Sequence, residues 1–106
     1  MKTQQIFKKE DVLAYLVVLG CKHLSYSEHQ IGTNNIIGCL ERIVSQTRQY
    51  DVKLAELIEK REHLNGRWWF EENNEEFDRL TQECNHKLYN LYLSLDLYQP
   101  LEIDEE

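Results

Sequence analysis

The residue types that most often bind metals or carry out catalysis are few in this sequence. It contains three cysteines and four histidines, and two pairs of them share a Cys-x-His spacing. The pairs are Cys21 with His23 and Cys84 with His86. Residues two apart on a helix point in different directions, so neither pair forms one side of a zinc clamp. We therefore expect no metal site and no cofactor, with buried cysteines and surface histidines instead.

Motifs that support catalysis are absent from the sequence. It has no Gly-rich phosphate-binding loop, no HExxH metalloprotease motif and no nucleophile elbow. The acidic cluster over residues 71–78 lacks the alternating carboxylates, the glycine and the closing glutamate of a calcium-binding loop. We therefore expect that the protein is not an enzyme.

The cysteines and one apolar run bear on the location of the protein. An odd number of cysteines without a CxxC motif favours a reducing compartment, so we expect a cytoplasmic protein. Lys8–Lys9 before the apolar run 12–19 could be taken for a secretion signal, but Glu10 and Asp11 lie where such signals avoid acidic residues. The run is also too short to span a bilayer, so we expect no membrane association.

The net charge of −7 at pH 7 is distributed unevenly along the chain. Residues 1–63 contain nine Lys/Arg and eight Asp/Glu, whereas residues 64–106 contain three against eleven, a balance of −8. An acidic half of this kind repels phosphate groups and attracts basic surfaces. We therefore expect a protein partner with a basic surface, and we expect nucleic acid binding to be disfavoured.

The length of 106 residues fits a single domain with one modest core. One proline and four glycines are too few turn-forming residues for a β-sandwich or barrel, and good helix formers are abundant. The sequence therefore predicts an all-α fold. Its expected parts are a helix at about 8–22, a loop at 23–33, helices at about 34–64 and 74–98, and an acidic tail at 100–106.

The strongest periodic signal belongs to the predicted helix 34–64. Its stripe is spaced by alternating steps of four and three, the pattern of a coiled-coil seam. The members are Ile36, Leu40, Ile43, Thr47, Tyr50, Leu54, Leu57, Arg61 and Leu64. Asn65-Gly66 provides a helix stop, and Asn73 with Glu76 matches a capping box that starts the next helix. The pattern predicts one continuous helix of about 45 Å.

The predicted helix 8–22 is shorter than the predicted helices 34–64 and 74–98. This difference in length predicts that part of the two longer helices lacks cover. The short connection at 65–73 makes helices 34–64 and 74–98 a long antiparallel hairpin. The helix 8–22 covers only about 22 Å of that hairpin, at its open end. We therefore expect a three-helix bundle whose closed end is completed by a second copy, as a homodimer, or by another protein.

The predicted contact site lies at this closed end and at the tip of the hairpin. Adjacent tryptophans beside an arginine are typical of residues that dominate interface energies. The opposing interpretation is that the aromatic residues fold back and cap the hairpin as part of its core. The candidate partner-binding residues are Tyr50, Leu54, Leu57, Arg67, Trp68, Trp69, Phe70, Glu71 and Glu72.

Three functions are compatible with these patterns. The first, which we favour, is a non-catalytic protein-binding regulator or adaptor, in the style of an immunity protein, a secretion chaperone or a phage inhibitor. The second is a small helix-turn-helix DNA-binding regulator that uses residues 25–44, with Thr33–Val44 as its recognition helix. The third is a structural homodimer.

Overall fold

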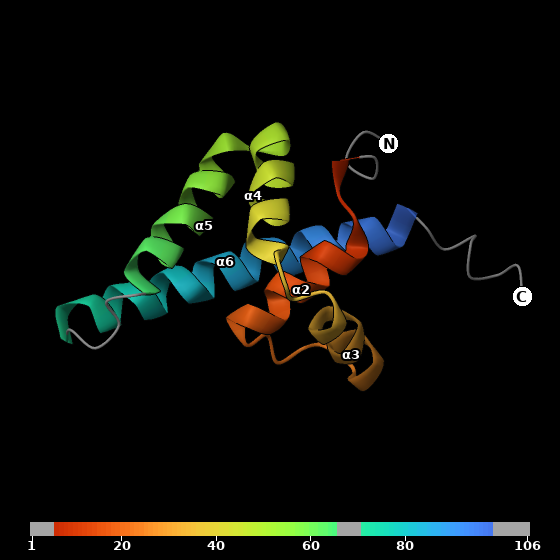
Figure 1. The fold of residues 1–106 in the computed structure, drawn as a ribbon, viewed down its shortest axis with the longest axis horizontal. Helices are drawn as coiled ribbons and strands as arrows, with labels where there is room; N and C mark the ends of the chain where they lie inside the picture. The colour runs from red at the N-terminus through yellow and green to blue at the C-terminus, as the bar shows by residue number, and fades with distance from the viewer. Residues whose placement is uncertain (1–5, 66–70, 99–106) are drawn as a thin grey trace, which may run out of the picture.

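The computed structural model describes residues 6–65 and 71–98, with the side chains of 6–65 and 75–95. Within these residues the chain forms helices and no strand, so the predicted all-α fold is confirmed (Figure 1). The described helices are α2 (Lys9–Leu19), α3 (Tyr26–Asn34), α4 (Cys39–Tyr50), α5 (Val52–Asn65) and α6 (Glu71–Tyr98). The predicted three-helix bundle is wrong, because these ranges contain five helices.

Helix α2 lies at the centre of the fold and packs against α3, α4 and α6 (Figure 1). Most of its residues are buried, as expected for a run that is apolar on nearly all sides. Gly20 ends the helix in the left-handed region, with a φ of 76°, and its N–H donates to the Val17 carbonyl at 3.0 Å. The helix is therefore shorter than the predicted range 8–22.

Helix α3 occupies a segment that the sequence analysis assigns to a loop at 23–33. It begins at a capping box, in which Ser25 Oγ accepts from the Glu28 N–H and Glu28 Oε1 accepts from the Ser25 N–H. Gly32 allows α3 to approach α2 closely, because a Cβ there would lie 2.6 Å from the Leu13 carbonyl oxygen. Capping and close packing thus stabilise a helix that has little apolar periodicity.

The predicted continuous helix 34–64 is also wrong. The chain leaves the helical conformation at Asp51, between α4 and α5, where φ is −157° and ψ is 102°. Asp51 Oδ1 accepts from the Lys53 N–H at 3.1 Å and so acts as an N-cap for α5. Helices α4 and α5 pack against each other, so the chain turns back on itself at Asp51 (Figure 1).

Tertiary packing gives the physical reason for this bend. Helix α4 packs on α2 and buries Ile43 and Thr47, whereas α5 packs on α6 and buries Leu54 and Ile58. A straight helix cannot follow two neighbours that lie in different directions. Burial against both neighbours therefore outweighs the local preference for a continuous helix.

Helix α6 begins at Glu71 rather than at 74, so the predicted cap Asn73 lies inside it. It runs antiparallel to α5, because Arg61 Nε donates to Thr81 Oγ1 at 2.7 Å while Leu54 lies beside Leu91, further along α6. The expected pairing of helices across 65–73 is therefore present. It is shorter than the predicted long hairpin because α4 turns away.

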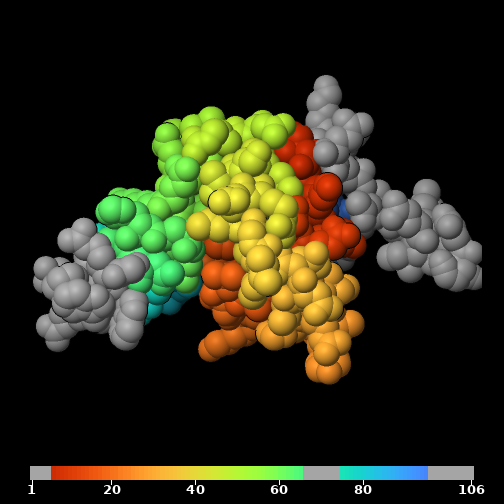
Figure 2. Space-filling model, in the orientation of Figure 1, coloured from red at the N-terminus to blue at the C-terminus, as the bar shows by residue number. Residues whose placement is uncertain are grey.

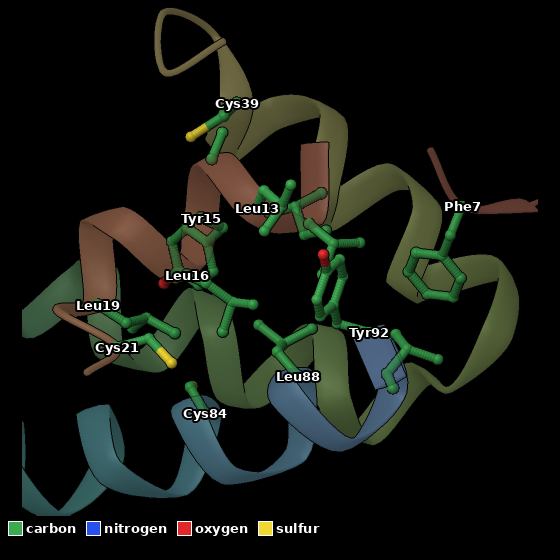
Figure 3. Close-up of a cluster of buried hydrophobic side chains, with 14 of the residues drawn as sticks. Phe7, Leu13, Tyr15, Leu16, Leu19, Cys21, Cys39, Cys84, Leu88 and Tyr92 are labelled. Atoms are coloured by element: carbon green, nitrogen blue, oxygen red, sulfur yellow. The ribbon is translucent and has the colours of Figure 1, made fainter. Parts of the chain in front are cut away.

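The core is built mainly where α2 meets α6, with further side chains from α4 and α5. Figure 3 shows this contact with Leu13, Leu16 and Leu19 on the α2 side and Cys84, Leu88 and Tyr92 on the α6 side. All three cysteines are free and buried. No helix in the described ranges combines the length and the hydropathy needed to cross a membrane.

Candidate partner-binding groove

The predicted contact residues at the hairpin tip are only partly covered by the structure. Glu71 and Glu72 form the start of α6, but their side chains lie outside the described part. The remaining tip residues lie outside the described ranges altogether: Arg67, Trp68, Trp69 and Phe70. A role of the tip in binding therefore stays a prediction.

The other three predicted contact residues have different environments. The Tyr50 side chain is 47 % exposed, and its ring meets the Phe7 ring edge-on at 5.4 Å between centroids. Leu54 is buried in the core, and Leu57 is half-buried against it. Tyr50 and Leu54 line a hollow of about 400 Å³ beside α6. Leu54 is therefore covered by the chain itself, and only Tyr50 offers a large exposed surface.

The described part of the closed end is covered unevenly, since Leu57, Leu64 and Phe77 are only half-buried whereas other side chains there are enclosed. Leu54, Ile58 and Leu80 are each 5 % exposed or less. The prediction that this end lacks cover assumed that one straight helix of 31 residues would extend beyond its neighbours. Because the chain bends at Asp51, α4 and α5 each lie against the rest of the molecule instead of projecting from it.

The bend creates a different feature, a groove between α4 and α5 with a volume of about 690 Å³. Both helices lie on the face shown in Figure 2, α4 in yellow and α5 in green. The floor and walls combine two half-buried apolar residues with polar and charged side chains. The lining residues are Leu40, Glu41, Val44, Ser45, Arg48, Gln49, Glu59 and Glu62, which we call the α4–α5 groove.

Charge in the α4–α5 groove is mainly negative, since three carboxylates line it together with one guanidinium. Arg48 of α4 donates from Nη2 to Glu59 Oε2 of α5 at 2.6 Å. Both side chains are about half exposed, so this pair contributes at most about 1 kcal/mol to stability. Glu62 is likewise paired with Arg61 of α5, so Glu41 supplies the excess negative charge of the groove.

Glu62 is held in place by groups from the interior. Its Oε2 accepts a hydrogen bond from the Tyr15 hydroxyl at 2.8 Å and another from Arg61 Nη1. Burial, followed by the charge of Glu62, raises the pKa of Tyr15 above its ordinary value. The Tyr15 hydroxyl therefore remains protonated and continues to donate at neutral pH.

Arg61 connects this carboxylate to α6. Its Nε donates to Thr81 Oγ1 at 2.7 Å, and its guanidinium carbon lies 4.5 Å from the centre of the Phe77 ring. Burial also raises the pKa of the neighbouring Cys84 thiol to about 12, which keeps that thiol protonated. Glu62 is thus the groove-facing end of a fixed polar network that crosses the molecule.

Three of the four residues of the Cys-x-His pairs line a second hollow of about 440 Å³ between the end of α2 and α6, whereas Cys84 is buried beside it. His23 and His86 both line it, and so does Cys21. The His23 and Tyr89 rings lie 5.1 Å apart between centroids. Among the described residues, no group of three or more His, Cys, Asp or Glu side chains is arranged to hold a metal ion.

The segment proposed as a DNA-recognition helix is interrupted. Helix α3 ends at Asn34, Gly38 adopts a φ of 76°, and α4 begins at Cys39. The range Thr33–Val44 is therefore not one helix. In addition, α3 packs mainly on α2. The expected motif needs α3 to pack on the helix after it, α4, whereas α3 packs on the helix before it.

Sequence reasoning missed the α4–α5 groove because it assumed a straight helix. Leu40 belongs to the apolar stripe and Val44 widens it, but Arg48 and Glu59 carry no signal of a shared surface. Arg48 and Glu59 are eleven residues apart and face each other only after the chain bends. Comparisons with protein families, with curated proteins and with solved structures found no match to this chain. Function is therefore inferred from the groove and its charges.

Proposed function

We propose that this protein is a non-catalytic regulator or adaptor that binds another protein through the α4–α5 groove. The partner segment would carry Lys or Arg residues next to an apolar side chain. The observation that supports this proposal is the groove itself, which combines half-buried Leu40 and Val44 with an excess of carboxylates. Contact between apolar side chains of the groove and the partner would supply affinity. Attraction between the carboxylates and the cationic groups of the partner would orient the partner and raise the association rate.

The size of the groove suits a short segment of polypeptide. About 690 Å³ falls in the range of sites that enclose several side chains. Two helices that form the walls of a groove are also a common way to receive an extended or helical segment. The fixed position of Glu62 favours binding because little side-chain freedom is lost when a cationic group meets it.

The non-catalytic part of the proposal rests on the lining residues. The described residues that line the groove include no histidine, cysteine or lysine, and Ser45 is the one hydroxyl among them. The lining therefore offers no Ser–His or Cys–His pair for nucleophilic catalysis, and we assign its three glutamates to binding. A reducing compartment such as the cytoplasm suits the three free, buried cysteines.

Selection from a phage-displayed library of random peptides on the immobilised protein tests this function. We expect the enriched peptides to contain Lys or Arg beside large apolar residues, and their binding to weaken as salt is raised. Enrichment of acidic peptides, or of none, would contradict the proposal.

Two pairs of variants locate the binding site of such peptides. Ser45→Trp fills the groove from an exposed position and should abolish binding, whereas Lys53→Trp on the exposed side of α5 should not. Glu59→Lys should weaken binding more than Glu56→Lys, which makes the same charge change outside the groove. Equal effects within each pair would place the site elsewhere.

A further inference from the structure

At Asp51, the corner between α4 and α5, the sequence pattern is that of a continuous helix, but the chain bends. The apolar stripe passes through it without a change of phase, since Thr47, Tyr50, Leu54 and Leu57 keep the steps of three and four. No glycine or proline occurs between Cys39 and Asn65. Only Asp51 lies outside the two helices. Local sequence therefore permits a continuous helix across the corner, and helix breakers do not impose the bend.

The contacts that hold the bend are few and identifiable. Asp51 caps α5 through the Lys53 N–H at 3.1 Å, and its own N–H still donates to the Thr47 carbonyl at 2.6 Å. Arg48 and Glu59 form a half-exposed ion pair between the helices. The remaining stabilisation comes from burial of α4 on α2, of α5 on α6, and of α4 and α5 against each other. All the tertiary contacts can form between two chains as well as within one.

We propose that this protein exchanges its N-terminal part with a second copy of itself. In the exchanged dimer, residues 39–65 form one continuous helix in each chain. The unit of α2, α3 and α4 from one copy packs on α5 and α6 of the other, and the reverse holds for the second copy. Each α4–α5 groove would then have one wall from each chain.

Physical reasoning favours this exchange over a new dimer surface. An exchanged dimer reuses every contact of the monomer, so its free energy differs only in the two corners and in the cost of association. A one-residue corner within an otherwise continuous helical pattern is a weak barrier to straightening. Rising protein concentration favours the dimer by mass action. The inference does not depend on the identity of any other partner.

Two single substitutions should move the equilibrium in opposite directions. Asp51→Ala removes the cap and places a strong helix former at the corner, so it favours the straight helix. Val52→Pro favours the bend, because proline suits the first position of α5 and requires an extended residue before it, as Asp51 already is. Val52 is half exposed, so little burial is lost.

Sedimentation velocity over a dilution series measures the result. We expect Asp51→Ala to raise the dimerisation constant roughly thirtyfold, since each dimer straightens two corners and a lost cap is worth about fivefold. Val52→Pro should remain monomeric at concentrations where the wild type dimerises. Glu56→Ala removes a charge from α5 away from the corner and should leave the constant unchanged. A monomer at all concentrations in both wild type and Asp51→Ala overturns the inference.

Cross-linking distinguishes exchange from an ordinary dimer. One population of the protein carries Arg48→Cys, and a second population with a different tag carries Glu59→Cys. The two populations are mixed, unfolded and refolded together. The refolded mixture is then treated with a short bis-maleimide. Exchange brings residue 48 of one chain to residue 59 of the other, so a covalent heterodimer should form. Adding Val52→Pro to both populations should abolish it. A dimer that forms without this cross-link, or despite Val52→Pro, contradicts exchange. The native cysteines are buried and protected from the reagent.

Discussion

The buried Arg61 side chain is the strongest constraint that a single residue places on this protein. Arg61 is only 5 % exposed. A guanidinium does not lose its proton in a protein, so the cost of burying its charge must be met by partners. Glu62, Thr81 and Phe77 supply the compensating charge, hydrogen bond and ring face. Such a charge is stable only while all its partners are in place.

We predict that Arg61→Ala destabilises the protein by about 3 to 5 kcal/mol, because it leaves the half-enclosed Glu62 carboxylate without its cation and opens a cavity. Urea denaturation followed by circular dichroism measures the change. Lys60→Ala serves as the control, since its ion pair with Glu76 at 3.3 Å is exposed and should be worth less than about 1 kcal/mol. Equal losses for both variants would show that burial of Arg61 has no special role.

Glu28 provides a second prediction, on pH. Partial burial acts to raise its pKa, but hydrogen bonds from the Ser25 N–H, the Tyr92 hydroxyl and the Ser25 hydroxyl outweigh it, so the pKa is lowered. A lowered pKa stabilises the folded state at pH values above the ordinary glutamate pKa of about 4.3, and that stabilisation is lost as the pH falls through the folded-state value.

The variant Glu28→Gln keeps the shape of the side chain and removes its charge. We expect it to be less stable than the wild type at pH 7, with the difference shrinking below about pH 4 as Glu28 becomes protonated. Thermal denaturation of both proteins over this pH range measures the difference. A constant difference from pH 7 to pH 3 would mean that the charged hydrogen bonds to Glu28 do not contribute.

At the scale of helices, the sequence predicted those helices whose apolar pattern is local to the segment. The apolar run 12–19 predicted a helix covered on most sides, although at the open end of a hairpin and not at the centre of the fold, and the apolar stripe that begins at Phe77 predicted most of α6. The helix at 26–34 could have been found, since Ser25 and Glu28 have the spacing of a capping box. This segment has little apolar periodicity, which is why the sequence pattern predicts a loop there despite the capping residues.

The bend at Asp51 could not be predicted in the same way. Its cause is the position of α2 and α6 relative to each other, and a periodic stripe contains no information about it. The α4–α5 groove follows from the bend, so spacing could not predict that Val44 and Arg48 of α4 would face Glu59 and Glu62 of α5. Polar residues that meet only through tertiary structure leave no local pattern.

The contact between α2 and α3 gives a prediction at this scale. Gly32→Ala places a Cβ within 2.6 Å of the Leu13 carbonyl oxygen and 2.7 Å of a Val17 methyl group, so the helices must separate. We expect a loss of about 1 to 3 kcal/mol, measured by thermal denaturation. Gly20→Ala is a useful comparison, since it meets no atom within 4 Å and adds only left-handed strain of about 1 kcal/mol.

If Gly32→Ala is no less stable than the wild type, α3 does not pack on α2 as described. If it loses no more stability than Gly20→Ala, the clash with the backbone of α2 is relieved by small movements, and the close approach of the two helices is not required for the fold.

At the scale of the whole molecule, burial is distributed unevenly among the helices. Helix α2 is covered by three other helices, whereas α3 lies on one side of it and buries little beyond Gly32. The free energy needed to open a segment follows the contacts that it must break. The molecule should therefore open from α3 inward, with α2 released last.

Native-state hydrogen exchange followed by mass spectrometry tests this order. We expect amides of α2 to exchange only through global unfolding and amides of α3 to exchange through a smaller, local opening. Raising the urea concentration should accelerate exchange in α2 more steeply than in α3, because global unfolding exposes more surface. Equal protection and equal urea dependence in the two helices would show that they open as one unit.

The central position of α2 has a consequence for biosynthesis. A polypeptide leaves the ribosome from its N-terminal side, and one of the three helices that pack on α2 is α6, which is translated last among the described helices. The Glu28–Tyr92 hydrogen bond, for example, joins residues 64 positions apart. The part of the apolar surface of α2 that α6 covers therefore stays exposed on a nascent chain until α6 has been translated, and during that interval chaperones and other nascent chains compete for it.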